Sequence, residues 1–484
     1  MPFIHKFETE KAKYIYDAPT SQILEVDKVT FAIIDDIDIL SEDEIIAKYA
    51  PHYPRHLLLQ ALRDLQKARS EQNLFLDHHY QSVSDIPLYA DYTPHPKMLV
   101  LQLTEKCNLR CCYCLSSYRE NSSLDMTFAT AAAAVTYFAE IANGDKLAIL
   151  FGGGEPLLKF PLIKKIVAHL ENLRPGKSKL YYLSTNLVNL TEEMIDFFLE
   201  HDFMLQVSLD GPKAKHDRYR VTPDGQGTYE TVVGNLMKLK KRSADYIRSK
   251  VKYSCVVAPP YDPAEIIQFF SSFERPWAYN INMVSGAGTT FFRDYCRSTD
   301  SVSLSAIPFT EKLREVLGKH DGRGEEDILY GMVSDMHGGW LARLHERRIL
   351  SHPVLWTNHS GQCRIATEKL CVDVKGRFFP CERLIFNRDY IIGDVDKGVE
   401  NESIIKVCEK FDKLRSHRCR TCWAVRLCPF CLQDLMFYED DQKKLDAICD
   451  EVMKPLVHER LRLYCSLLEE NPKAFDKLSS SGDL

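Results

Sequence analysis

The sequence predicts an α/β chain built on a partial (β/α)6 barrel of the TIM type, with a small module before it and a cysteine-rich domain after it. Two observations support this. Six apolar runs of strand length alternate with five helical stretches between Lys97 and Val284, and twelve of the sixteen cysteines fall in two groups. Strands that alternate with helices form parallel sheets through right-handed crossovers. A chain of 484 residues has room for these three parts.

The first 85 residues predict a winged-helix-like module. Lys13–Asp17 and Gln22–Val26 are predicted strands, and turn-forming residues separate them. Ser41-Glu42-Asp43-Glu44 has the pattern of a capping box and predicts the start of a short helix. A second helix is predicted from four apolar residues that share one helical face, Leu58, Ala61, Leu62 and Leu65.

Residues 95–290 predict the barrel. Its strands are predicted at Lys97–Leu103, Lys146–Phe151, Lys179–Leu183, Met204–Ser208, Lys252–Val257 and Tyr279–Val284. Its helices are predicted at Thr127–Ala142, Phe160–Leu173, Thr191–Glu200, Thr228–Lys241 and Ala264–Phe273. A connector follows over 291–355, with helices expected at Phe309–Leu317 and Asp327–Glu346. Residues 356–455 are cysteine-rich with little regular periodicity, and 456–484 are expected to be a C-terminal tail.

Composition argues against several classes of partner. The net charge of -6 and the pI of about 6.3 disfavour binding to nucleic acid. The first residues lack the pattern of a signal peptide, and no apolar run approaches the ~18 residues of a membrane span. We therefore expect a cytoplasmic protein with no membrane partner. In a reducing compartment clustered cysteines indicate metal ligands, whereas the isolated ones are expected to be small buried apolar residues: Cys255, Cys296, Cys408 and Cys465.

Polar or metal-binding motifs follow four successive predicted strands. They are Cys107–Cys114, Gly152–Pro156, Ser184–Asn186 and Ser208–Gly211. Active sites of β/α barrels form at the carboxyl ends of the strands. We therefore expect the four motifs to meet in one site.

The spacing Cys107-x3-Cys111-x2-Cys114 places three thiolates on one loop. Soft thiolates suit iron–sulfur clusters or zinc. Three ligands on a four-iron cluster leave one iron open, whereas a structural zinc site closes with four ligands. A zinc site that also uses Cys112 is the alternative, although we expect Cys112 to pack inward.

These residues resemble the radical S-adenosylmethionine (SAM) superfamily, through Cys-x3-Cys-x2-Cys with an aromatic Tyr113 and through Gly153-Gly154-Glu155-Pro156. The resemblance implies a [4Fe–4S] cluster that binds SAM and cleaves it to a 5'-deoxyadenosyl radical. Ser208-Leu209-Asp210-Gly211-Pro212, with His216 and Arg220 after it, resembles anaerobic sulfatase-maturing enzymes, in which the matching serine and arginine contact SAM. The expected cofactor-binding residues are Tyr113, Gly153, Gly154, Glu155, Ser184, Asn186, Ser208, Asp210 and Arg220.

The later cysteines resemble the SPASM extension, which implies two auxiliary [4Fe–4S] clusters. The resemblance implies the ligands Cys363, Cys371, Cys381 and Cys431 for the first cluster, and Cys419, Cys422, Cys428 and Cys449 for the second. The last close pair is separated by two residues, Pro429 and Phe430, where the family has three. A zinc ribbon is the alternative for the two Cys-x2-Cys pairs. Cys371 has the further alternative of facing a core.

Two more resemblances bear on the substrate. Glu382 follows Cys381 where sulfatase-maturing enzymes have an aspartate base, so it is a candidate catalytic base, with a surface or supporting carboxylate as the alternative. The N-terminal module resembles the recognition element of ribosomal-peptide maturases, in which a leader peptide adds a strand to the sheet. The edge would come from Lys13–Asp27. The alternative is a module that only stabilises the barrel.

Together these resemblances imply a maturase of a ribosomal precursor peptide with a leader. It most resembles the ranthipeptide type, which joins cysteine sulfur to carbon in thioether crosslinks. A flavodoxin or ferredoxin is the expected electron donor. The alternatives are formylglycine formation, as in sulfatase maturases, and a non-enzymatic iron–sulfur or zinc protein that binds a peptide and senses redox state.

Overall fold

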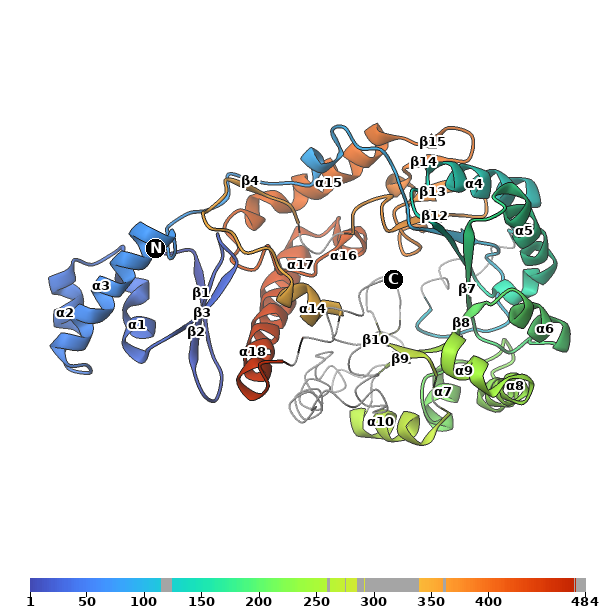
Figure 1. Cartoon of the computed structure of the whole chain (residues 1–484), viewed down its shortest axis with the longest axis horizontal. Coiled ribbons are helices and arrows are strands. Elements are labelled where there is room, and N and C mark those ends of the chain that lie inside the picture. The colour runs from blue at the N-terminus through green and yellow to red at the C-terminus, as the bar shows by residue number, and fades with distance from the viewer. Residues whose placement is uncertain are drawn as a thin grey trace.

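The computed structural model describes residues 1–114, 124–258, 262–274, 276–284, 291, 339–359, 363–473 and 475. Figure 1 shows an N-terminal module in blue at one end, a barrel in teal and green at the other, and the orange and red C-terminal part between and above them. In the described part of the chain, no helix is long and apolar enough to cross a membrane. The predicted helix Phe309–Leu317 lies outside the described residues, as does most of Asp327–Glu346. Its last turns form α14 (Gly339–His345).

The N-terminal module is a three-stranded antiparallel sheet followed by three helices. Its elements are β1 (Ile4–Glu8), β2 (Lys13–Asp17), β3 (Gln22–Val26), α1 (Lys28–Ile33), α2 (Glu42–Tyr49) and α3 (Arg55–Gln72). Both predicted strands are confirmed, and so is the capping box, in which the Ser41 amide donates to Glu44 at 2.8 Å. The four predicted apolar residues of α3 are buried. The first strand, β1, was not predicted.

The order β1-β2-β3 puts β2 in the middle of this sheet. Of the segment Lys13–Asp27, only β3 lies at an edge, and within the described residues no strand pairs with its outer side. The other outer strand, β1, packs against α18 (Lys454–Glu470). Within Lys13–Asp27 the edge of the sheet is therefore Gln22–Val26, which is shorter than the sequence suggested.

The module docks on the C-terminal part through aromatic side chains. The His5 ring stacks on Trp423 with centroids 3.5 Å apart, and its Nε2 lies 2.8 Å from Nδ1 of His458 on α18. Arg426 donates to the carbonyl oxygen of Pro19 at 3.3 Å. Because Trp423 follows Cys422 directly, the module contacts the loop that carries two of the predicted auxiliary ligands.

This contact predicts acid sensitivity. Burial, with a smaller contribution from His458, lowers the pKa of His5 from 6.5 to about 3. The neutral ring therefore stabilises the fold fully above pH 6.5, and this stability is lost as the pH falls toward 3. Lowering the pH from 7 to 5 is expected to cost about 2 kcal/mol through His5. Thermal melting at both pH values checks this, and His5→Phe, which keeps the stacked ring, should show a smaller loss. An equal loss in the two proteins would contradict it.

The barrel contains six parallel strands in the order β10-β9-β8-β7-β6-β5. Their bounds are β5 Met98–Gln102, β6 Lys146–Gly152, β7 Ser178–Thr185, β8 Met204–Ser208, β9 Val251–Val257 and β10 Ala278–Met283. The helices are α4 Phe128–Ile141, α5 Phe160–Leu173, α6 Glu192–Glu200, α7 Lys213–Tyr219, α8 Tyr229–Arg242, α9 Ala244–Lys250 and α10 Pro263–Ser272. All six predicted strands and all five predicted helices are confirmed, and the short α7 and α9 are additional. This confirms the α/β fold class.

The sheet does not end at β5. The C-terminal part adds four strands: β12 Lys369–Val372, β13 Arg377–Phe379, β14 Gly393–Asp394 and β15 Gly398–Val399. The first of them, β12, pairs in parallel with β5, with Lys369 opposite Met98, and the following strands are antiparallel. The result is one ten-stranded sheet shared by the barrel and the cysteine-rich region. A separate two-stranded parallel sheet pairs β4 (Ser82–Val83) with β11 (Trp356–Thr357).

The cysteine-rich region contains more regular structure than its sequence suggested. It holds α15 Asn401–Cys419, α16 Leu432–Tyr438, α17 Gln442–Ala447, one π-helical turn at Ile448–Met453, and then α18. The buried face of α15 consists of Ile404, Val407, Cys408, Phe411 and Arg415. The spacing is helical, but an arginine in the apolar face obscures the pattern. The segment expected to be a tail instead begins with α18.

Candidate active site

The loop that carries Cys107, Cys111 and Cys114 leaves the end of β5 and is held by the neighbouring strand end. Parallel pairing continues past the strands, because the Gly154 amide donates to Thr104 at 2.8 Å and the Glu155 amide donates to Lys106 at 2.9 Å. A Cβ on Gly153 would overlap the carbonyl oxygen of Thr104, and one on Gly154 would overlap that of Lys106. The two glycines are thus required for this close approach of two backbones.

Gly154→Ala is expected to displace the cysteine loop. The new methyl group collides with backbone, which cannot rotate away as a side chain can, so we expect a loss of about 1–3 kcal/mol in the free energy of unfolding. The iron content after anaerobic reconstitution should fall with it. The control is Gly234→Ala, because Gly234 lies exposed on α8 with open space around the added Cβ. Equal iron content in the two variants would contradict the prediction.

Glu155 is buried, with 1% of its surface exposed. Its carboxylate accepts hydrogen bonds from the Thr185 hydroxyl at 2.7 Å, the Asn186 amide at 2.8 Å and the Leu157 amide at 3.0 Å. Burial raises the pKa of this carboxyl, and the three donors oppose that effect. The side chain thereby links the end of β6 to the end of β7. Its contact with SAM stays a prediction.

The end of β7 also reaches the cysteine loop. The side-chain nitrogen Nδ2 of Asn186 lies 3.9 Å from Sγ of Cys107 and donates to Asn108 Oδ1 at 2.8 Å. The Leu109 amide donates to the same sulfur at 3.4 Å. Amide donors beside a cluster sulfur are one means by which proteins adjust iron–sulfur sites. Ser184 lies partly buried on β7, two residues before Asn186.

A buried ion pair ties the end of β8 to the cysteine loop. Arg220 donates to both oxygens of Asp210, at 2.9 and 3.1 Å, and the Tyr113 hydroxyl donates to the same carboxylate. The Val256 amide adds a fourth hydrogen bond at 2.9 Å. The guanidinium lies 5.4 Å from the centre of the Tyr113 ring. The sequence predicted Tyr113, Asp210 and Arg220 as cofactor ligands, and the structure joins them in one group that holds the loop.

A buried histidine supports this ion pair. His216 Nδ1 lies 3.3 Å from the Asp210 amide, and its Nε2 lies 3.1 Å from the Thr228 hydroxyl. Burial is the main cause that lowers the pKa of His216 to about 4, so the ring is neutral near pH 7. The neutral ring accepts a hydrogen bond from the Asp210 backbone N–H at Nδ1, and its own proton is on Nε2. Ser208, at the end of β8, is partly buried and lies opposite Ser254 of β9.

The three cysteines themselves lie partly buried. Burial raises the pKa of Cys107 to about 11 and that of Cys111 to about 12, and Arg220 partly offsets the effect at Cys111. Both thiols must lose a proton to bind iron. Cys112 packs against the apolar cluster that contains Tyr113, as expected, although Cys111 also contacts this cluster. Among the side chains that the structure describes, no three of His, Cys, Asp or Glu are grouped to hold a single metal ion.

The four strand-end motifs therefore meet in one site, as the sequence predicted. A family model described as the radical SAM superfamily matches residues 101–272, which include all four motifs. Residues 101–272 form a radical SAM domain.

Relatives of the radical SAM domain include protein maturases. A serine-type anaerobic sulfatase-maturating enzyme of Klebsiella aerogenes is 28% identical over 352 residues, which cover 71% of this chain and 81% of the relative. The cysteine-type enzyme of Clostridium novyi is 26% identical over 155 residues, or 31% of this chain and 41% of the relative. The radical SAM cyclopropyl synthase TigE of Paramaledivibacter caminithermalis is 25% identical over 164 residues, or 30% and 33% of the two chains.

The solved structure of anSMEcpe with bound AdoMet shares the fold of the radical SAM domain and its surroundings. The TM-score is 0.56 at 19% sequence identity, over 80% of this chain and all of the other. The chain spans about 40% of the length of the first curated relatives that it matches. At this level of identity the solved structure establishes the fold alone.

A second set of cysteines lines a cavity outside the radical SAM domain. Its walls include all four ligands predicted for the second auxiliary cluster: Cys419, Cys422, Cys428 and Cys449. Burial raises the pKa of Cys419 and of Cys428 to about 12. Phe411, Arg415 and Phe430 complete part of the wall. Sequence reasoning missed Arg415, whose only signal was a charged residue at a buried helical position.

The ligands predicted for the first auxiliary cluster are only partly brought together. The charge of Cys381 contributes to raising the pKa of both the Cys371 and the Cys431 thiol, so these three residues lie near one another. Cys371 is fully buried on β12 and also contributes to the barrel core. Cys363 is exposed, and the three residues before it lie outside the described part of the chain. The placement of Cys363 beside the others stays a prediction.

Glu382 lies beside this group of cysteines. Lys369 Nζ donates to its Oε1 at 3.3 Å, while its Oε2 is buried with no hydrogen-bond partner in the described structure. Burial opposes ionisation, but the nearby Lys369 charge holds the pKa of Glu382 below its usual value. Glu382 is therefore an ionised carboxylate with one oxygen left to accept a proton or a hydrogen bond. Of the isolated cysteines, Cys255, Cys408 and Cys465 are buried as predicted, and Cys296 lies outside the described residues.

Proposed function

We propose that this chain is a maturase that modifies a ribosomal precursor peptide and joins cysteine sulfur to carbon in thioether crosslinks. The observation that carries the proposal is the cavity lined by four cysteines outside the radical SAM domain. A radical SAM domain alone needs three cysteines, so four more around a separate cavity support an auxiliary cluster. An auxiliary cluster suits a reaction that removes electrons from the substrate as well as hydrogen.

The residues at the barrel mouth fit the cofactors of such an enzyme. Cys107, Cys111 and Cys114 would hold a [4Fe–4S] cluster, and Ser208 and Arg220 would contact SAM. When bound, these cofactors supply an electron and a carbon-centred radical that abstracts hydrogen from the substrate. The protein keeps the cysteine loop rigid through Asp210, Arg220 and Tyr113, all of which are buried. Their burial excludes water from the back of the site.

Two auxiliary clusters would be held outside the barrel. We assign Cys419, Cys422, Cys428 and Cys449 to the second, and Cys363, Cys371, Cys381 and Cys431 to the first. Four thiols that line one cavity fit a cluster by their chemistry. Glu382 is the candidate base of the reaction, since its Oε2 has no hydrogen-bond partner within the described structure.

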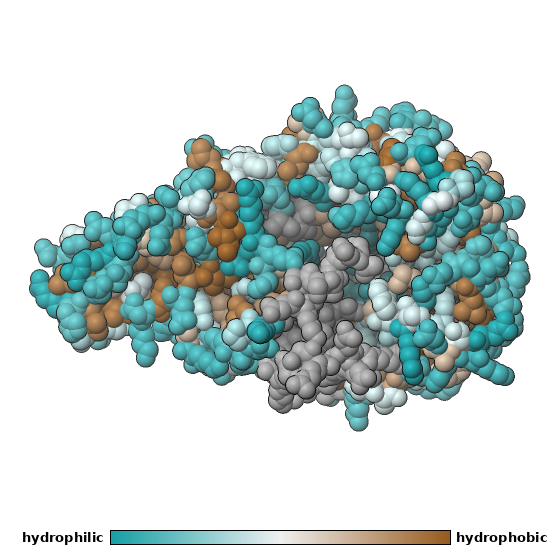
Figure 2. Space-filling view, in the orientation of Figure 1, coloured by the Kyte–Doolittle hydropathy of each residue, from teal (hydrophilic) through white to brown (hydrophobic). Residues whose placement is uncertain are grey.

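The N-terminal module is the proposed site for the leader peptide. The outer side of β3 offers main-chain groups to which an extended peptide could add as a strand. Figure 2 shows apolar side chains gathered over this module and near its junction with the rest of the chain. The relative anSMEcpe has been solved with a bound peptide, which is a property of that protein. The expected electron donor is a flavodoxin or ferredoxin, and the expected location is the cytoplasm.

Mass spectrometry of a co-expressed precursor peptide tests the proposal. A cysteine-rich peptide encoded beside this chain is expected to lose two hydrogens per crosslink and one iodoacetamide-reactive thiol for each. The same peptide without its leader is the matched control and should stay unmodified. An aldehyde that reacts with a hydrazine probe would instead indicate formylglycine formation. A peptide of unchanged mass with all thiols reactive would contradict thioether formation.

A further inference from the structure

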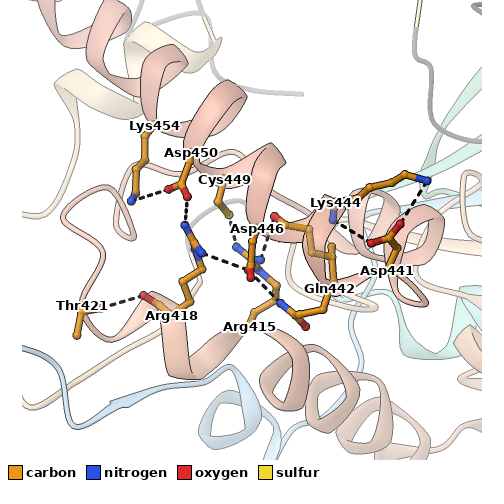
Figure 3. A network of polar contacts seen from close by, with 11 residues as sticks. Arg415, Arg418, Thr421, Asp441, Gln442, Lys444, Asp446, Cys449, Asp450 and Lys454 are labelled. Atoms are coloured by element: carbon orange, nitrogen blue, oxygen red, sulfur yellow. Dashed lines mark hydrogen bonds and ion pairs between the residues drawn. The ribbon is translucent and has the colours of Figure 1, made fainter.

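Arg415 lies in an unusual place for an arginine. It is 2% exposed, on the buried face of α15, one helical turn before Cys419. One guanidinium nitrogen donates to Sγ of Cys449 and another to the carbonyl oxygen of Leu445 at 3.4 Å (Figure 3). The Nε atom is buried and has no hydrogen-bond partner within the described structure. The guanidinium also lies 4.6 Å from the centre of the Phe430 ring.

The charge of Arg415 has no counter-anion among the described carboxylates. The acidic residues nearest to it in Figure 3 are engaged elsewhere. Arg418 pairs with Asp446 at 3.3 Å and also with Asp450, and Lys454 pairs with Asp450 at 2.9 Å. Arg418 also lines the cavity, but its charge is paired with these two carboxylates, whereas the charge of Arg415 is not. A buried charge is costly unless it is paired, so the cavity is where a compensating anion is expected.

The cavity has the chemistry to provide that anion. Four cysteines line it, and each becomes a thiolate when it binds a metal. A four-iron cluster held by four thiolates carries a net negative charge, and reduction adds one more negative charge. Arg415 touches one of those four sulfurs directly. A guanidinium in this position therefore stabilises the reduced cluster more than the oxidised one.

We propose that Arg415 is the counter-cation of the second auxiliary cluster and that its hydrogen bond to Cys449 raises the reduction potential of that cluster. The inference rests on the auxiliary cluster of the proposed function, but it does not depend on the peptide substrate or on the bond formed. Arg415 is a positioning residue, because it acts through the Cys449 sulfur and touches no reacting atom.

A redox titration followed by electron paramagnetic resonance tests this role. The full chain carrying Cys107→Ala, Cys111→Ala and Cys114→Ala leaves only auxiliary signals. A further variant of that background, Cys419→Ala with Cys422→Ala, identifies the signal that belongs to the cavity. Arg415→Met is expected to lower the potential of this signal by at least 59 mV, which equals a tenfold change in the ratio of reduced to oxidised cluster for one electron.

Two more variants separate charge from shape. Arg415→Lys keeps the charge and should give a potential between those of the parent and Arg415→Met. Lys413→Gln removes one charge from an exposed position of the same helix and should leave the potential unchanged. If Arg415→Met assembles no cluster, recovery of iron and sulfide in Arg415→Lys supports the charge role, and equal loss in both overturns it.

Three further results would overturn the proposal. They are an unchanged potential in Arg415→Met, an equal shift in Lys413→Gln, and a cavity that takes up zinc but no iron. Failure of the precursor peptide to be modified would overturn thioether formation alone. The potential is measured without peptide or SAM, so the two failures can be told apart.

Discussion

A chain in which Cys107, Cys111 and Cys114 are all replaced by alanine is expected to form no 5'-deoxyadenosine from SAM. The measurement is product formation after anaerobic reconstitution with iron and sulfide, followed by addition of dithionite and SAM. The three thiols leave the end of β5 on one loop, and no other cysteine of the radical SAM domain except Cys112 lies on that loop. Without these three cysteine ligands, the chain cannot hold a cluster with an open iron.

Cys112→Ala is the matched control for this experiment. Cys112 lies in the same loop but is not one of the three cysteines of the Cys-x3-Cys-x2-Cys spacing, so its loss should leave most of the product. Product from the triple variant would show that the radical SAM cluster is assigned to the wrong cysteines. Loss of iron from Cys112→Ala, as large as that from the triple variant, would show that Cys112 is itself a ligand.

Asp210→Ala is expected to destabilise the chain by about 3–5 kcal/mol, because it leaves the Arg220 guanidinium buried without its partner. The Tyr113 hydroxyl and the Val256 amide lose their acceptor as well. Two quantities are measured. The first is the free energy of unfolding of the metal-free chain in urea, with near-ultraviolet circular dichroism of the tyrosines as the signal. The second is the iron content after reconstitution, and both quantities should fall.

The double variant Asp210→Ala with Arg220→Met makes this test specific. The double variant contains no unpaired buried cation, so its free energy of unfolding should be larger than that of Asp210→Ala alone. Its iron content should still be low, since Tyr113 has no anchor in either protein. A double variant less stable than the single one would contradict the account of the ion pair.

The barrel was predictable because parallel strands are buried on both faces and therefore appear as continuous apolar runs. Leu99, Val100 and Leu101 of β5 are all almost fully buried, so the run itself marks the strand. The pairing of β12 with β5 was not predictable, because no local pattern connects segments so far apart in the chain. Helix α15 was missed because Arg415 interrupts the apolar face by which a helix is recognised.

The site was predictable where chemistry fixes the spacing of residues. The cysteines of the loop and of the cavity follow such spacings, and so do Gly153 and Gly154. The side chains that support them are not marked in the sequence. Thr185 and Thr228 are ordinary residues whose hydroxyls act here through hydrogen bonds at a strand end and a helix start. Their roles depend on distances that only the folded chain defines.

The pairing of β5 with β12 has a consequence for biosynthesis. Met98 lies opposite Lys369, so the outer edge of β5 stays unpaired during synthesis until β12 has been made. At a translation speed of about 5–20 residues per second, the gap of roughly 270 residues takes about 14–54 s. During that interval an apolar strand edge is exposed on the nascent chain, and such edges invite aggregation. Production of this protein should therefore benefit from slow expression at low temperature or from chaperones that shield nascent strands.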